Sequence, residues 1–225
     1  MNPTPSMNTE PMSTHANTRL PGKFLTLEGV DGAGKSTHVD WLVAHLRARG
    51  LTVVSTREPG GCALSETLRE LLLHTPMSLE TETLLMFAAR NEHLEQTIRP
   101  ALAAGAWVVS DRFTDATFAY QGGGRGLGAE RVAVLEQWVH PGFGPDRTWF
   151  FDVPLAVARE RLATARTPDR FEKESGAFFE RTRLAYQARA QAEPQRIKTL
   201  DGTWTIEALR EAIARDIDSL IGAPV

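Results

Sequence analysis

Residues 24–37 read FLTLEGVDGAGKST, an apolar strand pattern that runs into a glycine-rich turn and then into a helix pattern. The segment from Gly29 to Ser36 matches G-x-x-x-x-G-K-[ST] at every fixed position. In this motif, glycines let backbone amides converge on phosphate oxygens at the N-terminus of a helix. The stretch therefore predicts a nucleoside triphosphate site at the end of the first strand.

The residues of this loop differ in the chemistry that they offer to a triphosphate. Lys35 is expected to reach the β- and γ-phosphates as a point charge, and the Ser36 hydroxyl is placed to hold Mg²⁺. Asp31 is unusual: a carboxylate beside an anionic ligand is expected to point away from the phosphates, unless it only stabilises the helix N-terminus. The residues expected to bind ATP here are Gly29, Val30, Asp31, Gly32, Ala33, Gly34, Lys35, Ser36 and Thr37.

Apolar and β-branched runs alternate with helix patterns along the rest of the chain. The runs predict strands at 24–27, 52–55, 107–110, 148–151 and 197–200. The helix patterns cover 37–49, 63–74, 80–104, 129–140 and 205–221, with two more helices on either side of 164–172. This alternation predicts a three-layer α/β fold, in which a parallel five-stranded sheet carries helices on both faces. Ligands of such sheets bind at the carboxyl ends of the strands.

The length and composition are those of one globular domain. A chain of 225 residues, 42% apolar and 24% charged, is long enough for one buried core and short for two. Residues 1–20 are polar, contain three prolines and lack the apolar segment of a secretory signal, so we expect a disordered tail there. Residues 21–225 form the expected domain.

Charge and cysteine content argue against several other classes. The net charge of −3 argues against a general nucleic-acid binder, which usually carries a basic surplus. No run approaches 18 consecutive apolar residues, so no membrane span is expected. The single cysteine, Cys62, cannot form an internal disulfide, which favours the reducing cytoplasm.

Three classes of P-loop protein compete at this point. A switch GTPase normally carries an N-K-x-D motif that reads guanine, and this chain has none. An ATPase motor generally needs more chain and partner modules. A small kinase needs a second site that grips the phosphate of an acceptor, and arginines that close over the transferring group. The sequence offers candidates for both requirements, which favours the kinase.

Charged residues follow the second and third predicted strands, where ligands are expected. Arg57 follows the second strand and suits an acceptor phosphate, although a surface salt bridge with Glu58 or Glu66 is the alternative. After the third strand, Asp111 suits a carboxylate near Mg²⁺, and Arg112 comes next. Simple pairing of these two residues at the strand end is the alternative.

On the helix predicted over 80–104, Phe87 and Arg90 are three residues apart and share a face. An aromatic ring and a guanidinium together suit a pyrimidine, because the ring stacks and the guanidinium donates to a base carbonyl. Core packing is the alternative for Phe87. A shift of register by one residue would put Met86 and Asn91 in these places instead.

Five segments share their residues, order and spacing with a known family. They are LEGVDGAGKST (27–37), TREPGG (56–61), DRF (111–113), AYQGGGRG (119–126) and DRFE (169–172). Together they resemble the bacterial thymidylate kinase family of P-loop nucleoside monophosphate kinases, over residues 23–221. The resemblance implies a single-domain P-loop kinase fold with a mobile lid. It also implies transfer of the γ-phosphoryl of ATP to dTMP, Mg²⁺ as cofactor and a homodimer.

The resemblance also implies roles for single residues around the acceptor. Asp31 would contact the 3′-hydroxyl of the sugar and help order Mg²⁺, and Arg57 would bind the acceptor phosphate. Arg112 would bridge the donor and acceptor phosphates, and Tyr120 would lie under the deoxyribose and disfavour a 2′-hydroxyl. The remaining substrate-binding residues expected are Pro59 and, around the base, Phe87, Arg90, Thr117 and Gln121.

The basic segment 159–170 looks like the lid of this family. Since the phosphate loop has no arginine at its variable positions, the charge of the transition state must be neutralised from elsewhere. Arg166 is the first candidate for this role, followed by Arg161 and Arg170, which are also expected near ATP. The expected catalytic residues are Asp31, Lys35, Arg112 and Arg166.

Two other interpretations stay open. Another pyrimidine nucleoside monophosphate kinase, or a deoxynucleoside kinase, would share the phosphate loop and differ in the acceptor that it takes. A nucleotide-binding regulator without catalysis is expected to have a damaged loop or to lack some of these arginines, and none is missing here. An assay of ADP release with a panel of monophosphate acceptors separates these interpretations.

Overall fold

The computed structural model describes residues 22–163, 171 and 174–222 of the chain. Its centre is a five-stranded sheet in the order β2-β3-β1-β4-β5, in which every neighbouring pair is parallel. The strands are β1 (Phe24–Glu28), β2 (Val53–Arg57), β3 (Trp107–Asp111), β4 (Arg147–Asp152) and β5 (Ile197–Asp201). The predicted parallel five-stranded sheet is confirmed.

Each strand continues beyond its apolar run to a charged residue at its carboxyl end. These residues are Glu28, Arg57, Asp111, Asp152 and Asp201. Strand pairing aligns four of them, since Asp111 is in register with Arg57 and Asp152 is in register with Asp201. The sheet therefore brings charged side chains from separate segments to one edge.

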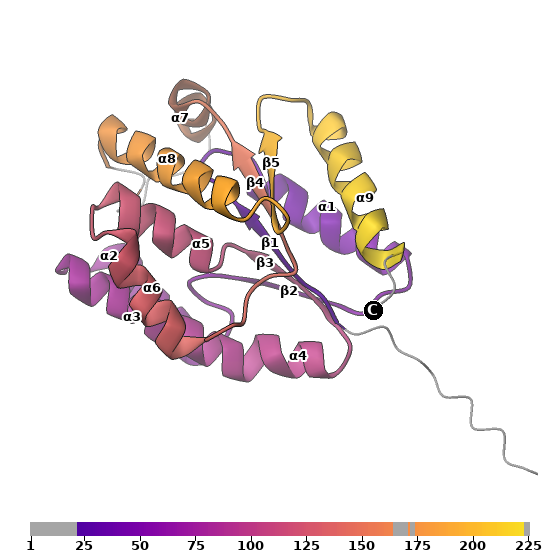
Figure 1. Cartoon of the computed structure of the whole chain (residues 1–225), viewed down its shortest axis with the longest axis horizontal. Coiled ribbons are helices and arrows are strands. Elements are labelled where there is room, and N and C mark those ends of the chain that lie inside the picture. Colours follow the sequence, from indigo (N-terminus) through magenta and orange to yellow (C-terminus); the bar gives the residue numbers. More distant parts are fainter. Residues whose placement is uncertain (1–21, 164–170, 172–173, 223–225) are drawn as a thin grey trace, which may run out of the picture.

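Helices cover both faces of the sheet, as the alternation predicts (Figure 1). α1 (Lys35–Ala48) and α9 (Ile206–Gly222) lie on one face. The other helical segments lie on the opposite face or around the carboxyl edge: α2 (Ala63–His74), α3 (Leu79–His93), η1 (Leu94–Ile98), α4 (Arg99–Ala103), α5 (Thr114–Thr117), η2 (Phe118–Gly124), α6 (Ala129–Val139), α7 (Leu155–Ala163) and α8 (Gly176–Ala192). Within the described ranges, none of these helices has the length and apolar character needed to cross a bilayer.

The segment predicted as one helix over 80–104 is divided into three. α3 ends at His93, the π-helical turn η1 follows, and α4 begins at Arg99. Pro100 accounts for the interruption, because proline has no N–H to donate to the carbonyl four residues earlier and its ring crowds that carbonyl. The wider π turn relieves this conflict without ending the helical course. The helix predicted over 80–104 is therefore confirmed in extent, with a π-helical turn inside it.

The glycine-rich segment from Gly122 to Gly128 begins inside η2, which is π-helical. Two of its glycines lie directly against α8. A Cβ on Gly123 would be 2.5 Å from the Cβ of Ala185, and one on Gly124 would be 2.3 Å from Thr182 Oγ1. The missing side chains therefore allow α8 to pack on the backbone of η2.

His140 is a buried histidine that follows α6. Because a carbonyl oxygen can only accept, Nδ1 of His140 donates to Phe143 O at 2.9 Å, and Nε2 then accepts from Thr114 Oγ1 at 2.8 Å. Burial, followed by the positive charge of Arg90, lowers the pKa of His140 to about 4. The folded chain therefore holds this imidazole neutral at neutral pH.

We expect acid to destabilise the fold through His140. Between pH 6.5 and 4 the unfolded chain binds a proton here that the folded chain does not, so the free energy of unfolding falls as pH is lowered. In His140→Gln, the slope of this free energy against pH should be smaller by up to one proton. Urea unfolding across this range measures the slopes, with the exposed His74→Gln as control. Equal slopes for His140→Gln and the parent would contradict the neutral state.

Candidate active site

The loop from Gly29 to Ser36 joins β1 to α1 at the carboxyl edge of the sheet. Lys35 folds back over this loop, where its Nζ donates to the carbonyl oxygens of Gly29 and Val30 at 3.0 and 3.1 Å. Burial lowers the pKa of Lys35. Three glycines adopt positive φ angles, 145° at Gly29, 80° at Gly32 and 95° at Gly34. The loop is therefore a backbone cradle with an ammonium group at a helix N-terminus, an arrangement that suits phosphates.

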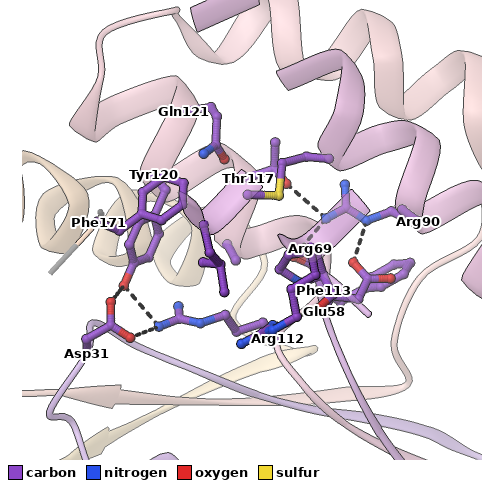
Figure 2. A pocket seen from close by; sticks show the side chains of 14 residues that line it. Asp31, Glu58, Arg69, Arg90, Arg112, Phe113, Thr117, Tyr120, Gln121 and Phe171 are labelled. Atoms are coloured by element: carbon purple, nitrogen blue, oxygen red, sulfur yellow. Dashed lines mark hydrogen bonds and ion pairs between the residues drawn. The ribbon is translucent and has the colours of Figure 1, made fainter. Parts of the chain in front are cut away.

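Arg112 follows β3 and links this loop to the neighbouring cavity (Figure 2). Among the described residues it is the one residue other than glycine with a positive φ, at 72°. Its Nη1 donates to Gly29 O at 2.9 Å and to the Tyr186 hydroxyl at 3.0 Å. Its Nη2 donates to Asp31 Oδ1 at 2.8 Å and to the Tyr120 hydroxyl at 3.0 Å. One guanidinium therefore joins the phosphate loop to η2 and α8.

Burial and charge set the protonation of this group. Burial raises the pKa of Asp31, but the charges of Arg112 and Lys35 outweigh it and hold this pKa below its ordinary value. Burial also raises the pKa of Tyr120 well above its usual range. The carboxylate is therefore charged and the phenol neutral, so the Tyr120 hydroxyl donates to Asp31 Oδ2, at 2.8 Å.

Glu28, at the end of β1, accepts hydrogen bonds from two neighbours of Arg112. It was not among the expected site residues. Its Oε1 accepts from the backbone N–H of Phe113, and its Oε2 from the Tyr186 hydroxyl, both at 2.7 Å. Burial, followed by the negative charge of Asp115, raises the pKa of Glu28 to about 7. A charged residue that ends an otherwise apolar strand is the signal that could have identified it.

A cavity opens beside Arg112 (Figure 2). Its lining comes from the phosphate loop, the turn after β2, α2, α3, the segment after β3, and residue 171: Asp31, Glu58, Pro59, Arg69, Leu73, Met86, Arg90, Arg112, Phe113, Ala116, Thr117, Tyr120, Gln121 and Phe171. The residues predicted to bind substrate that meet here are Pro59, Arg90, Arg112, Thr117, Tyr120 and Gln121. The fold thus gathers side chains that the sequence keeps far apart.

Arg90 reaches the cavity from α3 within a buried network. Its Nε donates to Glu58 Oε2 at 2.8 Å, and its Nη2 donates to Thr117 Oγ1 at 2.9 Å and to Phe113 O at 3.2 Å. Burial alone raises the pKa of Glu58, but the charge of Arg90 and the hydrogen bond with His93 hold it below its ordinary value. Nη1 of Arg90 is buried with no hydrogen-bond partner in the part of the chain that the structure describes. One donor of this side chain therefore remains for a ligand.

The structure does not bring Phe87 to the cavity. Phe87 is buried in the core with Phe118 and Val132, and Met86 lines the cavity instead. One step along an α-helix turns the side chain by about 100°, so residues four apart share a face more closely than residues three apart. The pair that lines the cavity is therefore Met86 and Arg90. The one-residue shift applies to Phe87, whose place Met86 takes, but not to Arg90. A thioether thus replaces the predicted aromatic ring.

Arg57 and Arg69 occupy different places near the turn after β2. Arg57 Nη2 pairs with Glu66 Oε2 at 2.8 Å, and both side chains are exposed, at 53% and 41%. This surface salt bridge is the alternative that the sequence left open for Arg57. Arg69, on α2, lines the cavity and donates from Nη1 to Pro59 O at 2.7 Å. No pattern in the sequence marks Arg69, because only the packing of α2 brings it there.

Asp111 and Ser36 are the residues predicted to hold a metal ion. Asp111 ends β3, and its Oδ1 is buried without a hydrogen-bond partner among the described residues. No group of three or more His, Cys, Asp or Glu side chains in the described ranges could hold a metal. Mg²⁺ commonly takes one or two protein oxygens and completes its shell with substrate phosphates and water. An unpartnered carboxylate oxygen near the phosphate loop fits that mode.

One of the three predicted lid arginines lies among the described residues. Arg161, on α7, donates from Nη2 to Gly202 O at 3.0 Å, and its Nη1 is 3.8 Å from the position that a Cβ of Gly34 would take. Arg161 therefore lies beside the phosphate loop. Arg166 and Arg170 lie outside the described residues.

A family model described as thymidylate kinase matches residues 27–213. The chain belongs to the thymidylate kinase family. A thymidylate kinase of Bordetella petrii is 64% identical over 203 residues, which cover 90% of this chain and 98% of the relative. A thymidylate kinase of Thiobacillus denitrificans is 63% identical over 201 residues, covering 89% and 98%. The crystal structure of thymidylate kinase from Ehrlichia chaffeensis matches with a TM-score of 0.72 and 29% identity, over 88% of this chain and 99% of that one.

The region matched to the thymidylate kinase family contains the whole phosphate loop and cavity. Within it, α7 packs so closely on the loop that Gly32 has no room for a side chain. A Cβ there would lie 2.3 Å from Ala158 O, a backbone atom that cannot rotate away. Gly50 has the same φ of 80° with nothing within 4 Å of its own Cβ position, which makes it a matched control.

Gly32→Ala should weaken ATP binding by about tenfold or more, because the loop must shift by an amount that disrupts its converging amides. Gly50→Ala should leave ATP affinity unchanged and lower the free energy of unfolding by about 1–2 kcal/mol, the cost of a left-handed alanine. Titration calorimetry with ATP and urea unfolding measure the two effects. Equal ATP affinity in both variants would show that the contact between α7 and Gly32 does not shape the nucleotide site.

Proposed function

We propose that this protein transfers the γ-phosphoryl group of ATP to dTMP, which gives dTDP and ADP. The observation that carries the proposal is the position of Arg112, whose guanidinium contacts the phosphate loop at Gly29 and the cavity at Asp31 and Tyr120. A cation at this boundary can neutralise charge on both a donor and an acceptor phosphate. The names of the relatives support dTMP as the acceptor.

ATP is proposed to bind along the loop from Gly29 to Thr37, with Lys35 at the β- and γ-phosphates. Arg161 lies beside this loop and is proposed to flank the nucleotide, together with Arg170. Ser36 and Asp111 would hold Mg²⁺, which supplies neutralisation of charge on the β- and γ-phosphate oxygens when bound.

dTMP is proposed to occupy the cavity with its phosphate toward Arg112 and its base toward α3. The unpartnered Nη1 of Arg90 suits a base carbonyl, with Met86, Thr117 and Gln121 beside the ring. The linked Asp31 and Tyr120 are proposed to contact the sugar, where the tyrosine ring disfavours a 2′-hydroxyl. Pro59 lines the cavity from the turn after β2, and Arg57 is proposed to reach the acceptor phosphate from its surface salt bridge.

Catalysis then consists of positioning and charge neutralisation, without a covalent enzyme intermediate. A phosphate oxygen of dTMP attacks the γ-phosphorus in line, and the bond from this phosphorus to the β–γ bridging oxygen breaks. Lys35 and Arg112 neutralise the charge that develops. We assign the remaining positive charge to Arg166, because the phosphate loop has no arginine at its variable positions.

An assay of ADP release tests the proposal against its alternatives. The parent protein is assayed with each of five acceptors, namely dTMP, dUMP, dCMP, dGMP and AMP. Lys35→Ala serves as the inactive control. We expect the highest kcat/KM for dTMP and none measurable in the control. Preference for another pyrimidine would favour a related monophosphate kinase, and ATP binding without turnover would favour a regulator.

Met86→Ala should affect mainly the KM for dTMP and Phe87→Ala mainly the stability of the fold, although the two residues are adjacent. Met86→Ala should raise the KM for dTMP by up to about tenfold, the range of a sulfur–ring contact. Its loss of stability should be smaller than that of Phe87→Ala, because Met86 is only partly buried against the core. Phe87→Ala should lower the free energy of unfolding by about 3–5 kcal/mol, because it leaves a cavity in the core. Steady-state kinetics and urea unfolding measure both. A selective rise of KM in Phe87→Ala would return the base contact to the aromatic residue.

We propose a homodimer that forms through α2, α3 and α6, and the cytoplasm as the compartment. The compartment is supported by the single cysteine. The dimer is supported by the large apolar side chains that these three helices expose, namely Leu64, Leu71, Leu84, Val134 and Trp138. Exposed apolar groups gathered on neighbouring helices are typical of protein interfaces.

Trp138→Glu should convert this dimer to a monomer, because it buries a charge in the proposed interface. Trp138 is 77% exposed in the single chain, so the substitution costs the monomer little stability. Trp204→Glu is the control, since Trp204 is also exposed but lies between β5 and α9. Sedimentation equilibrium gives the mass of each. A dimer that survives Trp138→Glu and a parent that is monomeric would both contradict the assignment.

A further inference from the structure

Gln121 lies in the wall of the cavity, and its amide could face a base in two ways. A side-chain amide offers a carbonyl oxygen that accepts and an NH₂ group that donates, at nearly the same place. Gln121 is 1% exposed, so its orientation is set by its protein neighbours rather than by bulk water. The end that faces the cavity determines which base edge can pair with it.

Glu82, on α3, determines this orientation. Nε2 of Gln121 donates to Glu82 Oε1 at 2.8 Å. Glu82 is also 1% exposed, and Arg125 donates from Nε to the same carboxylate oxygen at 3.0 Å. A carboxylate paired with an arginine stays charged and can only accept hydrogen bonds. A flipped amide would set its carbonyl oxygen against this charge, so the NH₂ group must face Glu82.

The amide oxygen is then directed to the other side. Figure 2 shows this oxygen on the side of the cavity where Arg90 lies. No described residue donates a hydrogen bond to it. Nη1 of Arg90 is a buried donor without a partner in the described part of the chain. The cavity therefore presents one acceptor from η2 and one donor from α3.

We propose that Glu82 is a specificity-determining positioning residue, which fixes the amide of Gln121 so that the cavity accepts thymine and rejects cytosine. This inference rests on the proposed function, namely on a pyrimidine bound in this cavity. Thymine carries a carbonyl oxygen next to a protonated N3, which match the Arg90 donor and the Gln121 acceptor. Cytosine carries an NH₂ group next to an unprotonated N3, so both contacts would face a group of the same kind.

The experiment compares Glu82→Gln and Glu82→Met with the parent, after urea unfolding has confirmed that each variant folds. Either change removes the group that can only accept, so the amide of Gln121 can turn. The kcat/KM for dTMP relative to dCMP should fall by about tenfold or more, since a mispaired buried polar group is what rejects cytosine. The ratio of dTMP to dUMP should stay unchanged, because both bases carry a protonated N3.

Glu80→Gln is the matched control, because Glu80 lies on the same helix with its side chain 64% exposed. It should keep the parent's ratios. Calorimetric dissociation constants for dTMP and dCMP, measured without ATP, repeat the comparison independently of turnover. A parent that fails to phosphorylate dTMP would contradict the proposed function. Parent-like dTMP-to-dCMP ratios in folded Glu82 variants, or an equal loss for all three acceptors, would overturn the role of Glu82.

Discussion

The guanidinium of Arg112 donates hydrogen bonds to acceptors from three separate segments, and the arrangement of the site depends on it. Gly29 and Asp31 belong to the phosphate loop, Tyr120 to η2 and Tyr186 to α8. The backbone at Arg112 adopts a left-handed conformation, which costs about 1–3 kcal/mol when a residue other than glycine is held there. The network offsets this cost and holds the phosphate loop, η2 and α8 together around Arg112.

Backbone contacts on both sides of Arg112 maintain that conformation. Its own N–H donates to Leu27 O at 3.0 Å, and the following N–H, of Phe113, donates to Glu28. The hydroxyl of Tyr186 connects Glu28 to the tip of the guanidinium. Glu28 is thus hydrogen-bonded to the backbone just after Arg112. Through the Tyr186 hydroxyl it is also linked to the side chain of Arg112. Buried polar groups that are fully hydrogen-bonded specify one geometry, because any alternative leaves a partner unpaired.

Buried carboxylates also orient polar groups that line the cavity. Glu58 occupies Nε of Arg90, and Thr117 and Phe113 O occupy Nη2, which leaves Nη1 for a ligand. Glu82 occupies the amide nitrogen of Gln121 and leaves its oxygen. In both cases a buried carboxylate accepts a hydrogen bond from one end of a side chain, so the other end of that side chain has a defined direction. Such pre-organised groups favour one pattern of ligand donors and acceptors over another.

The sequence alone determined the features that depend on residues close together in the chain. The phosphate loop is a local structure, since glycines, a lysine and a helix N-terminus follow one another in the chain. The alternation of strands and helices determined the parallel sheet, which places the ends of β1, β2 and β3 at one edge. Only the tertiary structure decided which side chains meet beyond that edge. Met86 rather than Phe87 lines the cavity because helix packing sets the rotation of α3. Arg69 and Glu82 reach the site through contacts between helices, which have no signature in the sequence of either helix alone.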